Sequence, residues 1–255
     1  METRHDDLRF AVLIDADNIS PVYIKEMLQE VAKYGTPTFK RIYGDWTSPR
    51  LSGWKNVLLE NAINPVQQYS YTTGKNASDS ALIIDAMDIL YTKRVDGFCI
   101  VSSDSDFTRL ATRLREAGMK VFGIGEKKTP SAFVSACDKF IYLEILAEES
   151  DEDHSKDSKQ KSTSKRGSRT KKSLNRPDKK IENLIKRSID DYSDDTGWVF
   201  LGELGNLLIK KKPDFDPRNY GFPKLLSLIK SFDSIEIDER DTGKRNVKHV
   251  FVRNK

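Results

Sequence analysis

Short, unbroken apolar runs alternate with longer stretches of helical spacing over residues 1–147. The run at residues 10–14 has the length of a buried strand, whereas residues 78–91 carry apolar side chains every three or four positions, as an amphipathic helix does. Apolar strands between amphipathic helices are typical of a parallel sheet covered on both faces, so we predict an α/β domain. Its predicted strands are residues 10–14, 39–43, 65–69, 97–102, 120–124 and 141–143, and its predicted helices are residues 21–34, 50–62, 78–91 and 107–117.

The pattern changes from residue 179 onward, where three helical stretches precede two short alternating segments. Apolar residues at helical spacing predict helices at residues 181–192, 201–209 and 219–232. The alternating segments at residues 234–238 and 247–252 enclose a Thr-Gly pair, which is typical of a β-hairpin. Three helices followed by a hairpin predict a small, winged-helix-like α+β domain.

Residues 148–178 separate the two regions and contain almost no apolar side chains. The formal net charge of +4 is concentrated there, because residues 148–180 carry 11 Lys and Arg against 7 Asp and Glu, whereas residues 1–147 carry 18 against 19. A segment this polar cannot bury enough surface to offset the entropy of ordering. We therefore predict domains at 1–147 and 179–255 joined by a flexible basic linker, which either only tethers them or also contacts nucleic-acid phosphates.

Composition excludes several classes of protein. No stretch approaches the ~18 consecutive apolar residues of a membrane span, and the polar N-terminus is unlike a secretory signal peptide. The chain has two Cys and three His, too few for a disulfide framework or for a metal site built on Cys or His. We expect a soluble, cytoplasmic protein in which any metal ion is held by carboxylates.

Acidic residues gather where the predicted strands end. Asp15 directly follows the first predicted strand, Asp104 and Asp106 follow the fourth, and Asp79 opens the helix after the third. Ligands of open parallel sheets bind at the carboxyl ends of the strands, so we expect these acids to meet at one edge. Grouped carboxylates repel one another unless a cation offsets their charge, and Mg²⁺ or Mn²⁺ prefers oxygen ligands. We predict these four Asp as metal ligands, with Asn18 positioning a phosphate or a metal-bound water.

Simpler roles for the same acids stay open. Asp79 and Asp104 also suit helix N-caps, and Asp15 suits a turn after a strand. Asp17 lies next to these acids in the sequence, but strand alternation allows its side chain to point elsewhere. Asp45 follows the second predicted strand and is a further candidate at the same edge. Because three acidic clusters map to one edge, the pattern favours metal-assisted hydrolysis of a phosphodiester.

Three motifs resemble those of the NYN domain. They are Leu13-Ile-Asp-Ala-Asp-Asn18, the Lys75–Asp79 segment, and Val101-Ser-Ser-Asp-Ser-Asp-Phe107. The motifs occur in the family's order, and the resemblance covers about residues 8–146. NYN domains belong to the PIN-like nuclease superfamily and include the bacterial LabA/DUF88 group, so the resemblance implies a Rossmann-like PIN fold and a metal-dependent ribonuclease. It also implies that metal binding and catalysis fall to the matching positions Asp15, Asn18, Asp79, Asp104 and Asp106.

The C-terminal region is similar to an OST-HTH/LOTUS domain over about residues 180–253. The similarity rests on Gly197-Trp-Val-Phe-Leu201, on Asn219-Tyr-Gly-Phe-Pro-Lys-Leu-Leu226 and on the hairpin that follows. Such domains occur fused to NYN domains and are associated with RNA binding. We read the aromatic and Leu residues of the second segment mostly as helix core, and the nearby cations either as RNA contacts or as a solvated face. The candidate RNA contacts are Lys210, Lys211, Lys212, Arg218 and Lys224, with Lys244, Arg245 and Lys248 at the hairpin end.

The resulting hypothesis is a metal-dependent endoribonuclease whose linker and C-terminal domain hold single-stranded or structured RNA. Tyr71 and Trp46 are candidates for stacking bases near the acidic edge, and Trp46 also suits packing. Two alternatives stay open: an RNA-binding adaptor with a vestigial site, and a haloacid-dehalogenase-like (HAD-like) phosphatase, because Asp15-x-Asp17 imitates that nucleophile motif. Ile19 stands where that motif normally has Thr or Val. No membrane partner is expected, and the sequence leaves the oligomeric state open, a homodimer included.

Overall fold

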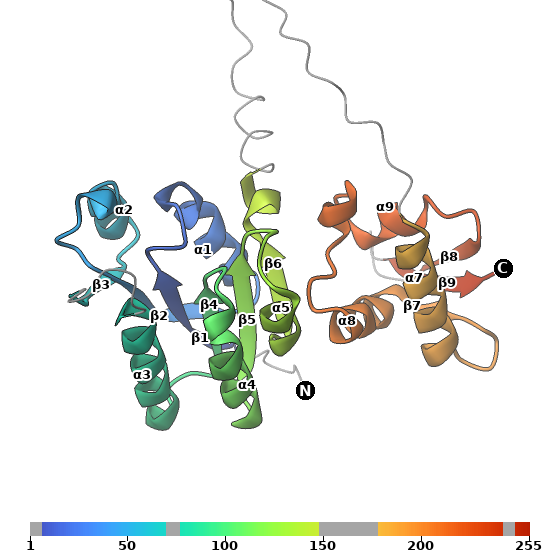
Figure 1. Ribbon diagram of the computed structural model, residues 1–255. Coiled ribbons are helices and arrows are strands. Elements are labelled where there is room, and N and C mark those ends of the chain that lie inside the picture. Colours follow the sequence, from blue (N-terminus) through green and yellow to red (C-terminus); the bar gives the residue numbers. More distant parts are fainter. Residues whose placement is uncertain (1–6, 70–76, 148–177, 242–247) are drawn as a thin grey trace, which may run out of the picture. The chain divides into compact units, whose positions relative to one another are not determined.

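The computed structural model describes residues 7–69, 77–147, 178–241 and 248–255. The chain divides into two compact units, residues 1–157 and 158–255 (Figure 1). The division falls within the predicted linker at 148–178, which lies outside the described residues except for Asp178. No helix in the described part of the chain is long and apolar enough to cross a membrane.

A six-stranded parallel sheet forms the centre of the N-terminal unit and confirms the predicted α/β class. Its strands are β1 (Arg9–Asp15), β2 (Thr36–Gly44), β3 (Asn64–Gln67), β4 (Gly97–Val101), β5 (Lys120–Gly125) and β6 (Lys139–Tyr142). They lie in the order β3-β2-β1-β4-β5-β6, so the strand order reverses between β1 and β4. Open α/β sheets bind ligands at such a switch point, outside the carboxyl ends of the strands.

Helices cover both faces of this sheet (Figure 1). They are α1 (Ile24–Ala32), α2 (Trp54–Glu60), α3 (Ala77–Thr92), α4 (Thr108–Glu116) and α5 (Ser131–Ala136), with single 3₁₀ turns leading into α1, α2 and α4. On one face α1 and α2 share a core with Val12 and Ile14 of β1. On the other, α3, α4 and α5 share a core with Ala11 and Leu13. Because alternate side chains of β1 serve both cores, this strand is an unbroken apolar run in the sequence.

The C-terminal unit packs helices against one face of a small antiparallel sheet, which confirms the predicted α+β domain. Its elements are α7 (Lys179–Tyr192), β7 (Val199–Phe200), α8 (Leu201–Lys211), α9 (Leu225–Ile229), β8 (Ile235–Asp241) and β9 (Lys248–Asn254). The strand order is β7-β9-β8. The predicted hairpin is present as β8 and β9, and its connection at 242–247 lies outside the described residues.

The prediction of one long helix at 219–232 is wrong. The chain instead forms a 3₁₀ turn at Pro217–Tyr220 and the short helix α9, separated by an extended Lys224. Gly221 adopts the left-handed conformation, with φ +81, and Pro223 keeps the preceding residue out of the helical region. Because the apolar residues nevertheless reach the core at helical spacing, the periodicity concealed the break.

Candidate metal site and nucleic-acid interface

The ends of β1 and β4 lie side by side at the switch point of the sheet. Ile14 pairs with Val101 in the parallel register, so the residues that follow them, Asp15 and Ser102, emerge together at the carboxyl edge. The Ser102 hydroxyl donates to the Asp15 carboxylate at 2.9 Å. The backbone N–H of Asp104 donates to the same hydroxyl at 3.1 Å. Ser102, which sequence reasoning missed, therefore connects the loops after the two strands.

Three of the predicted ligands converge at this edge. Asp79, Asp104 and Asp106 each place one carboxylate oxygen within 4.8 Å of the others. Asp79, in the first turn of α3, is only 8% exposed. Burial first, and then the neighbouring carboxylates of Asp15, Asp104, Asp106 and Asp17, together raise the pKa of Asp79 to about 6. Such a group of like charges in partial burial is typical of a cation site.

Asp15 lies beside this cluster but is engaged differently. It is 1% exposed, and its carboxylate accepts hydrogen bonds from Asn18 Nδ2 at 2.6 Å, from Ser102 and from the Asp17 N–H at 3.1 Å. Burial raises the pKa of Asp15, while the hydrogen bonds oppose that rise. The Asp15 carboxylate is thus held by three hydrogen bonds and in turn orients the Asn18 side chain.

The capping role is realised for Asp104 but not for Asp79, which is the third residue of α3. Asp104 is the N-cap of a 3₁₀ turn, and its carboxylate accepts the Asp106 N–H at 2.9 Å. Asp17 accepts a hydrogen bond from the Ser78 hydroxyl at 3.3 Å, next to the start of α3. Asp45 instead holds the loop after β2, because it accepts from the side chains of Thr47 and Gln67. A carboxylate that caps one N–H retains lone pairs for a cation.

A partly buried ion pair anchors α3 to the sheet. Asp85, two turns along α3 from the cluster, accepts from the Arg41 guanidinium and from the Tyr43 hydroxyl, both on β2. Tyr43 is fully buried and pairs in register with Asp15, and burial raises the pKa of its phenol. The contact connects the helix that carries Asp79 to the strand beside β1. A sequence signal for it was the charged Arg41 within an otherwise strand-like segment.

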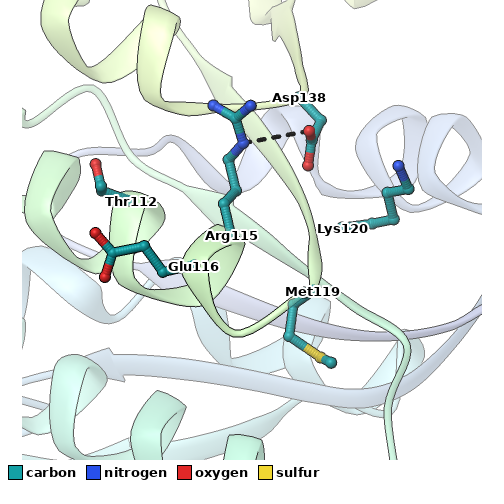
Figure 2. A pocket seen from close by; sticks show the side chains of 7 residues that line it. Thr112, Arg115, Glu116, Met119, Lys120 and Asp138 are labelled. Atoms are coloured by element: carbon teal, nitrogen blue, oxygen red, sulfur yellow. Dashed lines mark ion pairs between the residues drawn. The ribbon is translucent and has the colours of Figure 1, made fainter.

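Two hollows of the N-terminal unit lie away from the cluster. One, of about 440 Å³, lies at the amino edge of β5 beside the end of α4, where Arg115 Nε pairs with Asp138 at 3.2 Å (Figure 2). The other, of about 670 Å³, is an apolar groove beside α2 and β3 that includes Trp46 and Leu59. Trp46 Nε1 donates to the Val66 carbonyl at 3.0 Å, so this predicted stacking residue forms a fixed wall of the groove. The other predicted stacking residue, at position 71, lies outside the described residues.

The predicted RNA-contacting cations of the C-terminal unit are largely paired within it. Lys211 Nζ contacts Asp191 and the Ser188 hydroxyl, and Lys212 Nζ lies 2.6 Å from Asp214. The Arg218 guanidinium binds Asp216 through two donors, at 3.0 and 2.7 Å. Lys248 pairs with Glu239 at 3.3 Å, whereas Lys210 and Lys224 are exposed. The candidates Lys244 and Arg245 lie outside the described residues.

Comparison with known families divides the chain in the same way. The NYN domain model matches residues 9–144, and the OST-HTH/LOTUS domain model matches residues 172–247. No curated protein matches the chain. The two matches agree with the resemblance seen in the motifs and place the NYN domain before the OST-HTH/LOTUS domain.

Two solved structures show limited likeness to the chain. A crystal structure of a protein of unknown function from Vibrio parahaemolyticus is 18% identical with a TM-score of 0.46, and the match covers 55% of this chain and 94% of that one. A solution NMR structure of an uncharacterized protein from Nitrosomonas europaea is 33% identical with a TM-score of 0.27, covering 39% of this chain and 91% of that one. At these TM-scores neither likeness bears on function.

Proposed function

The chain belongs to the NYN domain family, and on this basis we propose that it is a divalent-metal-dependent endoribonuclease whose C-terminal OST-HTH/LOTUS domain binds its RNA substrate. The two families support a nuclease with an appended RNA-binding domain. The dependence on a metal ion, the internal cleavage of RNA and the roles of individual residues are our proposal.

The grouping of Asp79, Asp104 and Asp106 carries the proposal. Their carboxylates meet at the switch point of the sheet, from the start of α3 and the loop after β4. Burial and the neighbouring carboxylates both raise the pKa of Asp79, as expected where like charges lie close together. The mutual repulsion of such a group destabilises the fold, whereas a bound cation removes the repulsion.

The donor set fits Mg²⁺ or Mn²⁺. Both are hard cations that prefer carboxylate oxygens and retain bound waters, and the cluster consists of carboxylates alone. We propose that Asp79, Asp104 and Asp106 hold the ion. When bound, it supplies a Lewis acid that polarises the phosphate and activates a water for attack on phosphorus.

The remaining residues of the site orient its polar groups. Asp15 accepts a hydrogen bond from one N–H of the Asn18 amide. The second N–H and the amide oxygen of Asn18 are then left for a phosphate or a water. Ser102 holds the Asp104 backbone against the end of β1. We propose that Asp15 and Ser102 act through this positioning, because a carboxylate that is 1% exposed has little access to substrate.

The burial of Asp15 also weighs against the phosphatase alternative. A HAD-like enzyme would use this carboxylate as its nucleophile, yet it accepts three hydrogen bonds from neighbouring residues. The adaptor alternative differs from the nuclease only in turnover. Binding of RNA without cleavage in the presence of a divalent cation would support it.

Cleavage of a labelled RNA tests the proposal. The full chain is incubated with a single-stranded RNA labelled at one end, with Mn²⁺, with Mg²⁺ or with EDTA, beside DNA of the same sequence. We expect internal cuts in RNA with a divalent cation and none with EDTA. Absence of cleavage with either cation, at protein concentrations that bind the RNA, would refute the nuclease and favour the adaptor.

A further inference from the structure

The sheet of the C-terminal unit has one face toward the helices and one away from them. Ile235 and Val252 face the helices and share a core with Ile185 of α7. Side chains alternate along a strand, so every second residue of each strand points to the opposite face. The residues of that face are Glu236, Asp238 and Arg240 on β8, His249, Phe251 and Arg253 on β9, and Phe200 on β7.

Aromatic rings run across this outer face. Phe200 and Phe251 are cross-strand partners with ring centroids 5.7 Å apart, and the His249 ring lies 5.3 Å from Phe200. Trp198 directly precedes β7, and its backbone N–H is held by the Asp194 carboxylate at 3.1 Å. Rings fixed by the backbone and by one another lose little freedom when they bind a ligand.

Two arginines lie over these rings. The Arg240 Cζ atom is 4.1 Å from the centroid of Phe251, and the Arg253 Cζ atom is 4.6 Å from the centroid of Trp198. Guanidinium groups at these distances are held by cation–π attraction. Aromatic rings and guanidinium planes are the side-chain surfaces on which unpaired RNA bases stack.

Acidic neighbours accept hydrogen bonds from some of the N–H groups of each guanidinium. Asp238 accepts from Arg240 Nε at 2.8 Å, and Glu236 accepts from Nε and Nη2 of Arg253. A guanidinium has five N–H donors, so both arginines keep donors that complement the negative charge of a phosphate. The four side chains are 39–45% exposed, and ion pairs this exposed are weak enough to exchange for a phosphate.

We propose that this aromatic–arginine face, defined by Trp198, Phe200, Arg240, His249, Phe251 and Arg253, is the surface on which the C-terminal domain stacks the bases of single-stranded RNA. The inference rests on the proposed RNA-binding role of the domain and assigns that role to a surface. The surface differs from the cations of α8 and the turn after it because its arginines lie over aromatic rings on which bases can stack.

RNA suits this face better than a second copy of the chain does. Two copies meeting through it could only exchange arginine–carboxylate pairs that each copy already makes within itself. Bases instead require only planar surfaces, and their Watson–Crick edges supply N–H donors that carboxylates accept. The two acids therefore offer base-edge contacts beside the stacking surface.

Fluorescence anisotropy of a labelled, single-stranded RNA of mixed sequence tests the inference. The full chain is titrated in EDTA, so that no cleavage intervenes, as wild type, Trp198→Ala, Trp198→Phe and Arg253→Ala. Stacking on one ring contributes enough that we expect Trp198→Ala to weaken binding at least about tenfold. Trp198→Phe keeps a ring and is expected to stay within about threefold of wild type.

Two matched controls separate this face from the helical side. Lys210→Ala and Lys224→Ala remove exposed cations of the same domain and are expected to weaken binding by about twofold each. Glu236→Gln removes a negative charge from the face and is expected to tighten binding by about twofold, a direction that loss of a purely structural contact would not give. Weaker binding by the lysine variants than by Trp198→Ala would overturn the inference.

A second measurement guards against misfolding of the alanine variant. The wild-type chain is prepared with 5-fluorotryptophan, and the ¹⁹F resonance of Trp198 is assigned with Trp198→Phe. RNA that stacks on this face shifts that resonance, whereas RNA bound elsewhere leaves it in place and refutes the inference. If wild type binds no RNA at all, the proposed RNA-binding role itself fails; if it binds but Trp198 is unaffected, only the assignment to this face fails.

Discussion

The carboxyl edge of the N-terminal sheet and the cationic surface of α8 differ in whether their charges are balanced within the protein. At the edge, Asp79, Asp104 and Asp106 lie within 4.8 Å of one another, and the charged groups that raise the pKa of Asp79 are all carboxylates. On α8 and just after it, Lys211 and Lys212 each pair with a carboxylate of their own domain.

This difference separates charges that stabilise the fold from charges that require a ligand. A lysine paired within its domain contributes to folding and has less to offer a phosphate, whereas a paired guanidinium keeps further N–H donors. Grouped carboxylates raise the energy of the fold until a cation joins them. We therefore expect the acidic cluster to bind a ligand and the paired lysines to serve mainly the fold.

The largest expected effect comes from removing one carboxylate of the edge. Asp104→Asn is expected to lower RNA cleavage in Mn²⁺ by more than about a hundredfold, because loss of a ligand should exceed the 10- to 100-fold cost of losing an outer contact. Cleavage rates are measured under single-turnover conditions. Asp88→Asn removes an exposed acid from α3, the helix that carries Asp79, and as the control should cleave as wild type does. Equal rates for both variants would contradict the account.

The next effect concerns a paired cation. Arg218 is 15% exposed and binds the nearly buried Asp216 through two donors. Arg218→Ala is expected to lower the free energy of unfolding of the C-terminal unit by about 2–3 kcal/mol, because the buried carboxylate loses its partner. Urea denaturation measures this value. A variant of unchanged stability but much weaker RNA binding would show that this cation acts on RNA after all.

An intermediate effect is expected at the anchor of α3. Asp85→Asn keeps the shape of the side chain but weakens its contacts with Arg41 and Tyr43. We expect Mn²⁺ affinity to fall about tenfold, since the helix that carries Asp79 is less firmly held. Isothermal titration calorimetry measures the affinity, and Tyr43→Phe should reproduce part of the loss. Lower stability with unchanged Mn²⁺ affinity would limit the anchor to a structural role.

The pH dependence of metal binding gives a smaller effect with a definite sign. The pKa of Asp79 is about 6 in the folded chain against an ordinary 3.8, so its contribution to stability is complete below pH 3.8 and is lost as the pH rises through 6. A cation favours the ionised form. Mn²⁺ is therefore expected to raise the Tm by about 5 °C at pH 7.5 and much less at pH 5. Calorimetric scans showing equal shifts at both pH values would argue against Asp79 as a ligand.

The smallest effect is expected where a lysine is already paired. Lys211→Ala should change RNA affinity by less than about twofold and lower stability by about 0.5 kcal/mol, as for an exposed ion pair. The same anisotropy titration and urea denaturation measure both values. A tenfold loss of affinity with this variant would erase the contrast between the two regions.

Much of the fold could be predicted because its signals are local. The buried strands of the N-terminal domain are unbroken apolar runs, and its longer helices keep regular apolar spacing. The helix α5 was missed because its six residues offer less than two turns of periodicity. The prediction of a long helix at 219–232 was wrong because the backbone at Gly221 and Pro223 interrupts the helix despite the apolar periodicity.

The candidate site was predictable only where topology brings residues together. Asp104 and Asp106 follow β4 at the carboxyl edge of the parallel sheet. Asp79 reaches them because α3 packs against β2 and β1 and contacts the turn after β4. The hydrogen bonds that hold Asp15 and Ser102 depend on register between strands far apart in the sequence, which no local pattern reveals. The aromatic–arginine face was not predicted for the same reason: the hairpin could be predicted, but its register and its pairing with β7 could not.

Direct titration of Mn²⁺ into the metal-free chain tests the central claim that the carboxylate cluster holds a divalent cation. Electron paramagnetic resonance at pH 7.5 measures free Mn²⁺ beside wild type, Asp104→Asn and Asp88→Asn. We expect wild type and Asp88→Asn to bind Mn²⁺ equally, and Asp104→Asn to lose at least about tenfold in affinity. Equal binding by all three proteins, or no binding by wild type, would contradict the account.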